Sequence, residues 1–402
     1  MTTVIKNGIV IDTDPVGAQR ADLLIEDGRI AAVGQDLHGD EVIDATDRIV
    51  LPGFVDSHRH TWQSVIRAVV PDADFAGYFT KVLGELAPRF TPEDVRIGNL
   101  MGALESLDSG TTTFLDWSHV QFTPGHTDAA VAGLEESGAR AIFGFCGPAG
   151  DLEAETRRVA KSGVPLIMAA SGPEFGDEDL ALREWRLADE LGLHISVHLG
   201  GHGPEAAERG LAWMRVNGFP LTAIHANHYT DEALSELAAH GVCASVSPVD
   251  EMTLGIGYPI TGRAQAAGMP VSLSTDTVVC SPGDMFSLMR AAFTLECGRL
   301  SVADVLRMAT LEGARAVGLA DEVGSLRPGK RADLVLLRTD TPVMAGTQDP
   351  VGAVVLNADT AAVDTVLVGG RVVKRDGRLV GHDLPALVES LRAAGKRVVG
   401  PA

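Results

Sequence analysis

The middle of the chain alternates short apolar runs with segments of helical periodicity, and this alternation limits the fold more than any other feature of the sequence. Segments such as 91–107 and 231–239 show the periodicity of amphipathic helices, and Thr91 and Thr230 stand before early acidic residues as helix-capping residues do. Eight strands that are each followed by a helix predict a (β/α)8 TIM barrel over residues 53–325. The eight apolar runs with the length of buried strands are 53–55, 111–115, 141–145, 165–170, 194–199, 221–225, 244–247 and 271–275.

Both ends of the chain have a different pattern, in which strand-like pieces are separated by turn dipeptides. Asn7-Gly8 and Asp27-Gly28 interrupt apolar runs near the start. Such dipeptides favour two-residue hairpin turns, because their residues tolerate positive φ. Gly369-Gly370 and Asp376-Gly377 have the same character near the end. We therefore expect both ends to build one composite β-sandwich domain, with bounds at 1–52 and 326–382, and a C-terminal helix or tail over 383–402.

The composition of the chain argues against some classes of binding partner. The 402 residues carry 33 basic and 54 acidic side chains, a net charge of −21, which argues against nucleic acid or an anionic membrane surface as partner. The N-terminus lacks a signal-peptide pattern, and no apolar run reaches the roughly 18 residues that span a bilayer. The four cysteines form no CxxC pair. We expect a cytoplasmic protein with a small-molecule substrate, and an acidic surface that is compatible with a homodimer.

Histidines and an aspartate follow several of the predicted strands. His58 and His60 end the first strand, and side chains two residues apart leave a strand on the same face, so both can point at one metal ion. His198, His225 and Asp276 end the fifth, sixth and eighth strands. Because barrel enzymes carry their sites at the C-terminal ends of the strands, we expect these five residues to lie together.

Several motifs resemble the amidohydrolase superfamily, in particular its branch of chlorohydrolases and aromatic deaminases. They are the runs LPGFVDSHRH at 51–60, SGTTT at 109–113, STD at 274–276 and GSLRPGKRADLV at 324–335, together with the histidines of strands five and six. The resemblance implies that His58, His60, His198 and Asp276 hold one divalent metal ion. Tetrahedral nitrogen and oxygen coordination favours zinc, with iron or manganese as alternatives.

The resemblance also implies the activity and the roles of two residues. The expected reaction is metal-dependent hydrolysis of a carbon–nitrogen bond, other than a peptide bond, in a small cyclic or amide-like substrate. Asp276 would be the general base that takes the proton of water and passes it to the leaving group. His225 would stand behind the metal ligands and orient the water or polarise the substrate.

One position departs from the pattern of that branch. The deaminases carry a glutamate three residues after the strand-five histidine, which passes a proton to a ring nitrogen, whereas this chain has Gly201. Two alternatives therefore stay open beside the hydrolase: a heteroaromatic deaminase with a substitute proton donor, and a metal-dependent lyase or binding barrel without hydrolysis. The candidates for the substitute donor are His119, His202, His228, Asp250 and Glu251, which all follow strands.

Other residues near strand ends are candidates for contact with the substrate. Trp62 and Gln63 follow the His-x-His motif, and Glu174 follows the fourth strand. His119, His202, His228 and Glu251 belong to the same set. Phe75, Tyr78 and Phe79 lie in the long segment after the first strand, where they form either an aromatic lid or packing against the outer helices.

Overall fold

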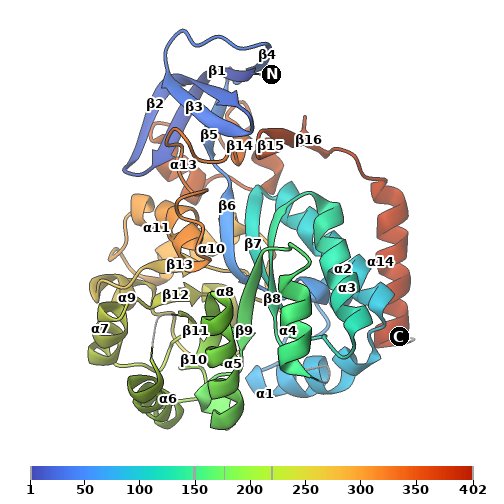
Figure 1. Ribbon diagram of the computed structural model, residues 1–402. Coiled ribbons are helices and arrows are strands. Elements are labelled where there is room, and N and C mark those ends of the chain that lie inside the picture. Colours follow the sequence, from blue (N-terminus) through green and yellow to red (C-terminus); the bar gives the residue numbers. More distant parts are fainter. Residues whose placement is uncertain (1, 148–150, 176, 219–220, 401–402) are drawn as a thin grey trace.

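The computed structural model describes residues 2–147, 151–175, 177–218 and 221–400 (Figure 1). Within these residues, eight parallel strands form one sheet in sequential order, so all eight predicted strands are confirmed. The strands are β6 (Phe54–Arg59), β7 (Thr111–Ser118), β8 (Arg140–Phe145), β9 (Leu166–Ala170), β10 (Ile195–Leu199), β11 (Thr222–His225), β12 (Cys243–Val246) and β13 (Val271–Leu273).

The two edges of this sheet meet at its C-terminal end. The backbone N–H of His60 donates to the carbonyl of Asp276 at 2.8 Å, and the N–H of Asp276 donates to the carbonyl of His58 at 2.9 Å. These bonds join β6 to the segment that follows β13, which places the first and eighth strand ends side by side. The predicted TIM barrel is confirmed, and the His-x-His motif lies at its seam.

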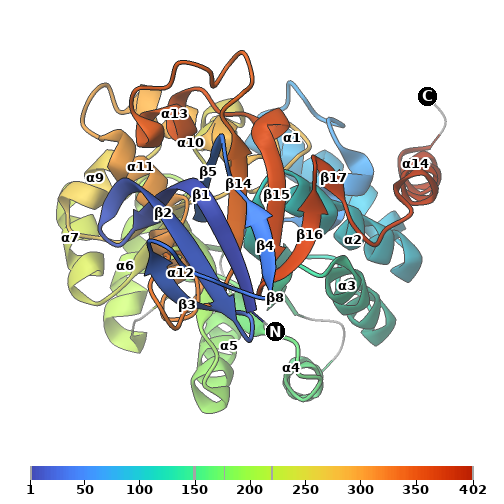
Figure 2. The same ribbon diagram turned by 90° about the horizontal axis from the view of Figure 1, so that it is seen from above.

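Helices follow the barrel strands and cover the outside of the barrel (Figures 1 and 2). Thr91 begins α2 with a capping box that it forms with Asp94, and the Thr230 side chain accepts from the N–H of Ala233 at the start of α7, as the sequence predicts. The helices are α1 (Phe75–Tyr78), α2 (Pro92–Asp108), α3 (Pro124–Ser137), α4 (Leu152–Ala160), α5 (Glu178–Leu191), α6 (Pro204–Asn217), α7 (Asp231–Ala239), α8 (Pro248–Thr253), α9 (Thr261–Ala266), α10 (Met285–Leu295), α11 (Val302–Met308), α12 (Leu311–Ala316) and α13 (Pro350–Leu356).

The two chain ends form a second sheet outside the barrel. Strand β5 from the first end pairs antiparallel with β14 from the second, so residues 2–52 and the C-terminal strands share one mixed sheet (Figure 2). Its strands are β1 (Thr2–Thr13), β2 (Val16–Glu26), β3 (Arg29–Gly34), β4 (Glu41–Asp44), β5 (Arg48–Pro52), β14 (Leu334–Arg338), β15 (Val363–Val368), β16 (Arg371–Arg375) and β17 (Arg378–Leu379).

This sheet folds back on itself around a core of its own. The β2–β3 turn and the β15–β16 turn belong to strands far apart in the sheet, yet a Cβ on Gly28 would lie 2.6 Å from the carbonyl oxygen of Gly369. Ala332 donates its N–H to the carbonyl of Gly28 at 2.9 Å. Leu23, Leu334 and other apolar residues from both chain ends fill the space between. The domain bounds at 52, 326 and 382 stay predictions.

Three of the four turn dipeptides form the turns of β-hairpins as expected, and the fourth does not. Asp27-Gly28, Gly369-Gly370 and Asp376-Gly377 all have positive φ at both residues. The predicted turn at Asn7-Gly8 is wrong, because β1 continues through it with a bulge in its pairing to β2. A Cβ on Gly8 would lie 2.8 Å from Cγ2 of Val50, so the glycine serves the close approach of β1 to β5 rather than a turn.

The chain ends in α14 (Leu384–Val399), which lies along α2 and apart from the outer sheet (Figure 1). Arg397 pairs with Asp94, and Arg89 donates to the carbonyl of Val398 at 3.1 Å. None of the helices in the described residues is long and apolar enough to cross a membrane.

Candidate active site at the C-terminal end of the barrel

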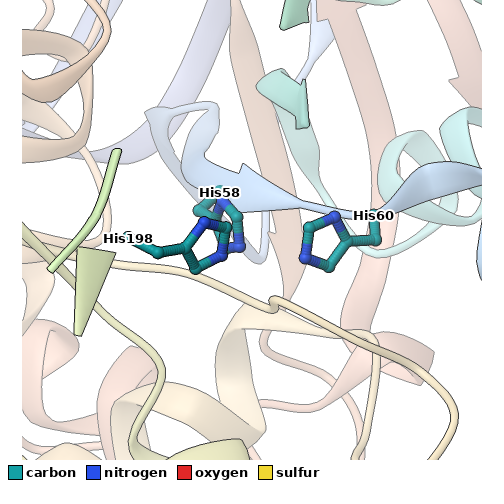
Figure 3. A group of neighbouring side chains, drawn as sticks. All are labelled: His58, His60 and His198. Atoms are coloured by element: carbon teal, nitrogen blue, oxygen red, sulfur yellow. The ribbon is translucent and has the colours of Figure 1, made fainter. Parts of the chain in front are cut away.

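Three imidazole rings meet at the seam of the barrel. His58 lies in β6, His60 directly follows it, and His198 lies in β10. Figure 3 shows the three side chains in one region, with the rings of His58 and His198 overlapping in this view. One ring nitrogen from each lies within 4.8 Å of the others, a spacing that suits ligands of a single metal ion. The structure thus brings together three residues that stand up to 140 positions apart in the sequence.

Asp276 completes this group. Its Oδ1 lies 3.2 Å from Nε2 of His58 and 3.2 Å from Nε2 of His60. Its backbone adopts the left-handed conformation with φ of 58°, which non-glycine residues rarely adopt and which is frequent at functional sites. The two hydrogen bonds to β6 hold the backbone of Asp276 against the His-x-His motif.

A backbone carbonyl fixes which nitrogen of His60 faces the centre. Nδ1 of His60 lies 2.6 Å from the carbonyl oxygen of Trp117. Because a carbonyl oxygen only accepts, Nδ1 carries the hydrogen, and the lone pair of His60 is on Nε2, which faces Asp276. Both ring nitrogens of His58 are buried without a hydrogen-bond partner among the described residues.

The charges at the centre are those of a metal site. Burial lowers the pKa of His58 to about 4, and burial with the nearby histidines holds the pKa of His198 well below its usual value, so both rings are neutral. Burial would raise the pKa of Asp276, but the imidazoles of His58 and His60 hold it well below its usual value. Neutral nitrogens and an ionised carboxylate form a donor set that fits a divalent cation.

His225 stands beside this centre, at the end of β11. Its Nε2 lies 3.6 Å from Oδ2 of Asp276, and its Nδ1 lies 3.2 Å from Oε1 of Glu251. Burial opposes the charged form of His225, but the carboxylates of Glu251 and Asp276 raise its pKa above the usual value. Glu251 also accepts from the N–H of Ser247 and the amide of Asn227, both at 2.9 Å. The ring of His225 is therefore held rigidly with one nitrogen toward the centre.

Arg59 faces away from the metal centre, between the two histidines of the motif. It is 1% exposed, pairs with Glu105 of α2, and donates to Oγ of Ser106 at 3.1 Å and to the carbonyl of Gly283 at 3.3 Å. Through these bonds it ties β6 both to α2 and to the segment that follows Asp276.

We expect Glu105→Gln to destabilise the protein, because it leaves the buried guanidinium of Arg59 without its counter-ion. The loss should be about 2–4 kcal/mol, somewhat below the range for fully buried pairs because the Glu105 side chain is partly exposed. Glu93→Gln is the matched control, since Glu93 pairs with Arg96 on the surface, and should cost less than about 1 kcal/mol. Urea unfolding of both variants measures this. Equal losses of unfolding free energy in the two variants would show that the Arg59–Glu105 pair contributes no more stability than a surface ion pair.

A cavity of about 240 Å³ opens onto the centre. Four side chains of the centre line it (His60, His198, His225 and Asp276), and a largely aromatic and aliphatic wall faces them. Of the described residues on this wall, none is a lysine or arginine, and Asp276 is the one carboxylate. The remaining lining residues are Phe75, Tyr78, Phe79, Leu83, Trp117, His119, Ala170, Ser171, Gly201, His202, Leu254, Ile256 and Thr277.

Two of the predicted substrate contacts lie on the cavity wall. His119 follows β7, and its ring centroid is 4.3 Å from that of His60. His202 follows β10, and its ring lies 5.5 Å from that of Phe75. The aromatic segment after β6 also lines the cavity, through Phe75 and Tyr78 of α1 and Phe79 of the π-helical turn η2 (Phe79–Leu86), so the lid alternative describes these residues better than outer packing.

The other predicted contacts lie outside the cavity wall. Trp62 and Gln63 belong to the short helix η1 (Thr61–Ile66), which turns both side chains into the protein, where Trp62 packs on Phe90 and Gln63 donates to the Tyr78 hydroxyl at 2.7 Å. Nε2 of His228 lies 2.9 Å from the carbonyl oxygen of Ile256.

The carboxylates behind the wall are likewise engaged. Glu174 accepts from the N–H of Gly200 at 2.7 and 2.9 Å and from the Tyr229 hydroxyl at 3.1 Å. Glu251 holds His225, and Asp250 accepts from the N–H of Thr277 at 2.9 Å. Trp62, Gln63, Glu174, His228 and Glu251 thus do not line the cavity, and neither does Asp250. Their predicted contact with the substrate, and the roles of Asp250, Glu251 and His228 as substitute proton donors, stay predictions that this placement does not favour.

Sequence reasoning missed several wall residues, among them Trp117, Ser171 and Thr277. Trp117 carries a usable signal, because it stands two residues before His119 at the end of β7, the same spacing as in the His-x-His motif. Leu254 and Ile256 lie in the segment after α8, where the sequence has no hydrophobic periodicity that could predict a place in the cavity wall.

Gly201 lies on the cavity wall, three residues after His198. A Cβ built on it would meet Cγ2 of Ile256 at 3.7 Å and Cδ2 of His225 at 3.9 Å, which are ordinary contacts. The backbone and the nearest atoms therefore allow a Cβ at this position, which faces the cavity.

Comparisons with known proteins agree with this geometry. The model of the amidohydrolase family matches residues 49–373. The chain is 31% identical to a 5'-deoxyadenosine deaminase of Methanothermobacter thermautotrophicus, over 96% of this chain and 97% of that protein. It is also 31% identical to a 5-methylthioadenosine/S-adenosylhomocysteine deaminase of Desulforudis audaxviator, over 99% of both chains.

Solved structures show the same fold. An adenosine deaminase from Xanthomonas campestris with bound zinc superimposes with a TM-score of 0.89 at 24% identity, over 99% of this chain and 98% of that one. Atrazine chlorohydrolase from Arthrobacter aurescens, complexed with zinc, gives 0.87 at 23% identity, over 98% and 100%. The family match covers most of the chain and includes every strand of the barrel. The chain therefore belongs to the amidohydrolase family, as a hydrolase that acts on carbon–nitrogen bonds, other than peptide bonds, of small molecules.

Proposed function

We propose that the protein hydrolyses an amide bond in a small, neutral, cyclic or amide-like substrate, with one zinc ion held by His58, His60, His198 and Asp276. The observation that carries the proposal is that Asp276 is the single carboxylate among the described wall residues, while Gly201 on the same wall carries no side chain. The bound zinc of the adenosine deaminase and chlorohydrolase structures supports zinc over iron or manganese.

The residues of the site fit this reaction. A divalent ion at the centre would act as a Lewis acid on the substrate carbonyl and lower the pKa of water from about 15.7 to about 7. Asp276 lies where it can accept the proton of the attacking water and pass it to the leaving nitrogen. His225, held by Glu251, presents Nε2 to the same space and can stabilise charge that develops on the substrate.

An amide makes fewer demands on this site than an aromatic amidine does. When an amide bond breaks, one proton must reach the leaving nitrogen, and Asp276 can deliver it. When water adds to an aromatic amidine, a ring nitrogen needs a proton as well, and a second acid has to supply it. Glu174, Asp250 and Glu251 all lie behind the wall and bind protein groups.

The cavity wall also limits the charge of the substrate. With no lysine or arginine among its described residues, it offers no cation to pair with a phosphate or carboxylate. Phe75, Tyr78, Phe79 and Trp117 instead offer ring faces and edges, which suit a flat, uncharged molecule.

A second candidate function is deamination of an adenosine-like compound, which the two deaminases at 31% identity favour. This function needs a substitute for the missing acid, and His119 and His202 are the predicted donors that line the cavity. The lyase or binding barrel without hydrolysis, which the sequence alone leaves open, does not agree with membership of this family of hydrolases. The homodimer and the cytoplasmic location stay predictions.

A substrate panel separates the two candidate functions. Zinc-loaded protein is assayed on dihydrouracil, hydantoin and succinimide for ring opening, and on 5'-deoxyadenosine, adenosine, guanine and cytosine for ammonia release. We expect turnover of a cyclic amide and kcat/KM below about 10⁴ M⁻¹s⁻¹ on every aminated ring. Faster deamination would establish the second function, and zinc-bound protein that is inactive on both groups of compounds would contradict the proposed cyclic-amide substrate.

The space at Gly201 yields a separate prediction. Gly201→Glu should raise kcat/KM for 5'-deoxyadenosine, because it adds a second carboxylic acid to the wall, at a position where the natural chain has no side chain. The gain should be about 10²–10⁴, the usual contribution of a general acid. Gly201→Gln is the matched control, since it has the same shape without a transferable proton. Equal rates for the two variants would show that the glycine is not what limits deamination.

A further inference from the structure

His119 has a hydrogen-bonding capacity that the protein itself does not use. It lines the cavity, while its Nδ1 is buried and has no hydrogen-bond partner in the described part of the chain. Two other polar groups of the wall are engaged: the Tyr78 hydroxyl accepts from Gln63 at 2.7 Å, and the Thr277 hydroxyl accepts from the N–H of Val279 at 2.9 Å. Nε1 of Trp117, which is buried beside His119, has no partner among the described residues either, but it can only donate, whereas an imidazole offers both a donor and an acceptor. A buried polar side chain without a partner calls for an explanation.

The ring of His119 lies beside the metal centre rather than within it. Its centroid is 4.3 Å from that of His60 and 4.8 Å from that of Trp117, and it lies 6.4 Å from His198 with the two rings 26° from parallel. The group of nitrogens close enough to share one ion comprises His58, His60 and His198, without His119. A substrate atom near the centre would therefore lie next to this ring.

The surroundings decide where the hydrogen of the imidazole is. A neutral imidazole has one N–H and one lone pair. A hydrogen on Nδ1 would be a buried donor without an acceptor, which is costly. With the hydrogen on Nε2, Nδ1 keeps only a lone pair and the N–H is free for a ligand in the cavity.

We propose that His119 is a catalytic residue that donates a hydrogen bond from Nε2 to an acceptor atom of the substrate next to the scissile bond. This inference rests on the proposed function, since a carbonyl-containing substrate offers such an acceptor. It requires that the amide carbonyl of the substrate, or an oxygen or nitrogen acceptor next to it, lies on the side of β7. His119 keeps its proton throughout, so the residue orients and polarises the substrate while Asp276 transfers the proton.

The test uses zinc-loaded protein and acetohydroxamic acid, a small carbonyl ligand of metal centres, with affinity measured by titration calorimetry. His119→Phe keeps a flat ring of similar size and removes both nitrogens. We expect it to bind acetohydroxamic acid about tenfold more weakly than the natural chain, the usual effect of one lost hydrogen bond. His119→Gln, whose amide N–H can take the place of Nε2, should stay within about threefold. Zinc content and the unfolding midpoint should be the same in all three proteins.

Three results would overturn the inference: equal affinity of His119→Phe and the natural chain, loss of zinc from His119→Phe, or no binding of acetohydroxamic acid to the natural chain. These results are separate from the substrate panel. Fast deamination on the panel would refute the amide substrate, whereas the affinity series still reports whether His119 donates to a ligand at the centre.

Discussion

His58→Ala should give a folded protein that retains less than about a tenth of an equivalent of zinc and has no measurable hydrolase activity. His58 is fully buried, its two ring nitrogens have no hydrogen-bond partner in the described structure, and its Nε2 lies 3.2 Å from Asp276. Removing one of the three imidazoles leaves too few ligands for a tetrahedral site, so metal and activity should be lost together. Metal analysis and the cyclic-amide assay on the same sample measure both.

His126→Ala is the matched control for the loss of a buried histidine. His126 is 8% exposed, and its ring nitrogens lie 2.8 Å from the Thr123 hydroxyl and 3.0 Å from the carbonyl of Phe90, away from the centre. It should lower the unfolding midpoint and leave the zinc content at one equivalent. Activity in His58→Ala without zinc would show that the reaction does not depend on this centre.

Asp276→Asn should fold and lose about 10²–10⁴ in kcat, the usual range for the loss of a general base. Asparagine keeps the shape of the side chain but has no basic oxygen to accept a proton. Because Asp276 is also a proposed ligand, the zinc content of the variant must be measured together with kcat. If the variant retains zinc at excess metal and is still slow, the loss of rate is due to proton transfer and not to loss of the metal.

Asp250→Asn is the control for this second prediction. Burial and the nearby charge of Asp276 raise the pKa of Asp250 well above its usual value, so the neutral amide is a close mimic of the protonated acid. Its oxygens bind the N–H of Thr277 and the Ser281 hydroxyl rather than lining the cavity. We expect kcat within about tenfold of the natural chain, below the range for a lost general base. Near-natural kcat in Asp276→Asn would mean that another group accepts the proton.

The parts of the site that the sequence predicts depend on local periodicity. The two-residue period of a strand puts His58 and His60 on one face, and the barrel rule puts His198, His225 and Asp276 at the same end as that face. Both rules concern the backbone, and the structure follows them. The hairpin at Asp27-Gly28 follows for the same reason, since its positive φ values are a local property.

The parts of the site that the sequence does not predict depend on the direction in which side chains point after a strand ends. Glu174 and Glu251 both follow strands, as substrate contacts would, but each turns back to the protein, Glu174 to the N–H of Gly200 and Glu251 to His225. Trp62 and Gln63 are buried by the helical turn that follows His60. No period in the sequence encodes these rotations, because they are set by acceptors and donors that come from distant segments.

The most direct test of the metal centre is anomalous scattering from crystals of the active, zinc-loaded protein, measured on both sides of the zinc absorption edge. We expect one zinc peak per chain, in contact with the ring nitrogens of His58, His60 and His198 and with a carboxylate oxygen of Asp276. An active protein whose crystals show no peak at this position, or a peak held by other residues, would contradict it.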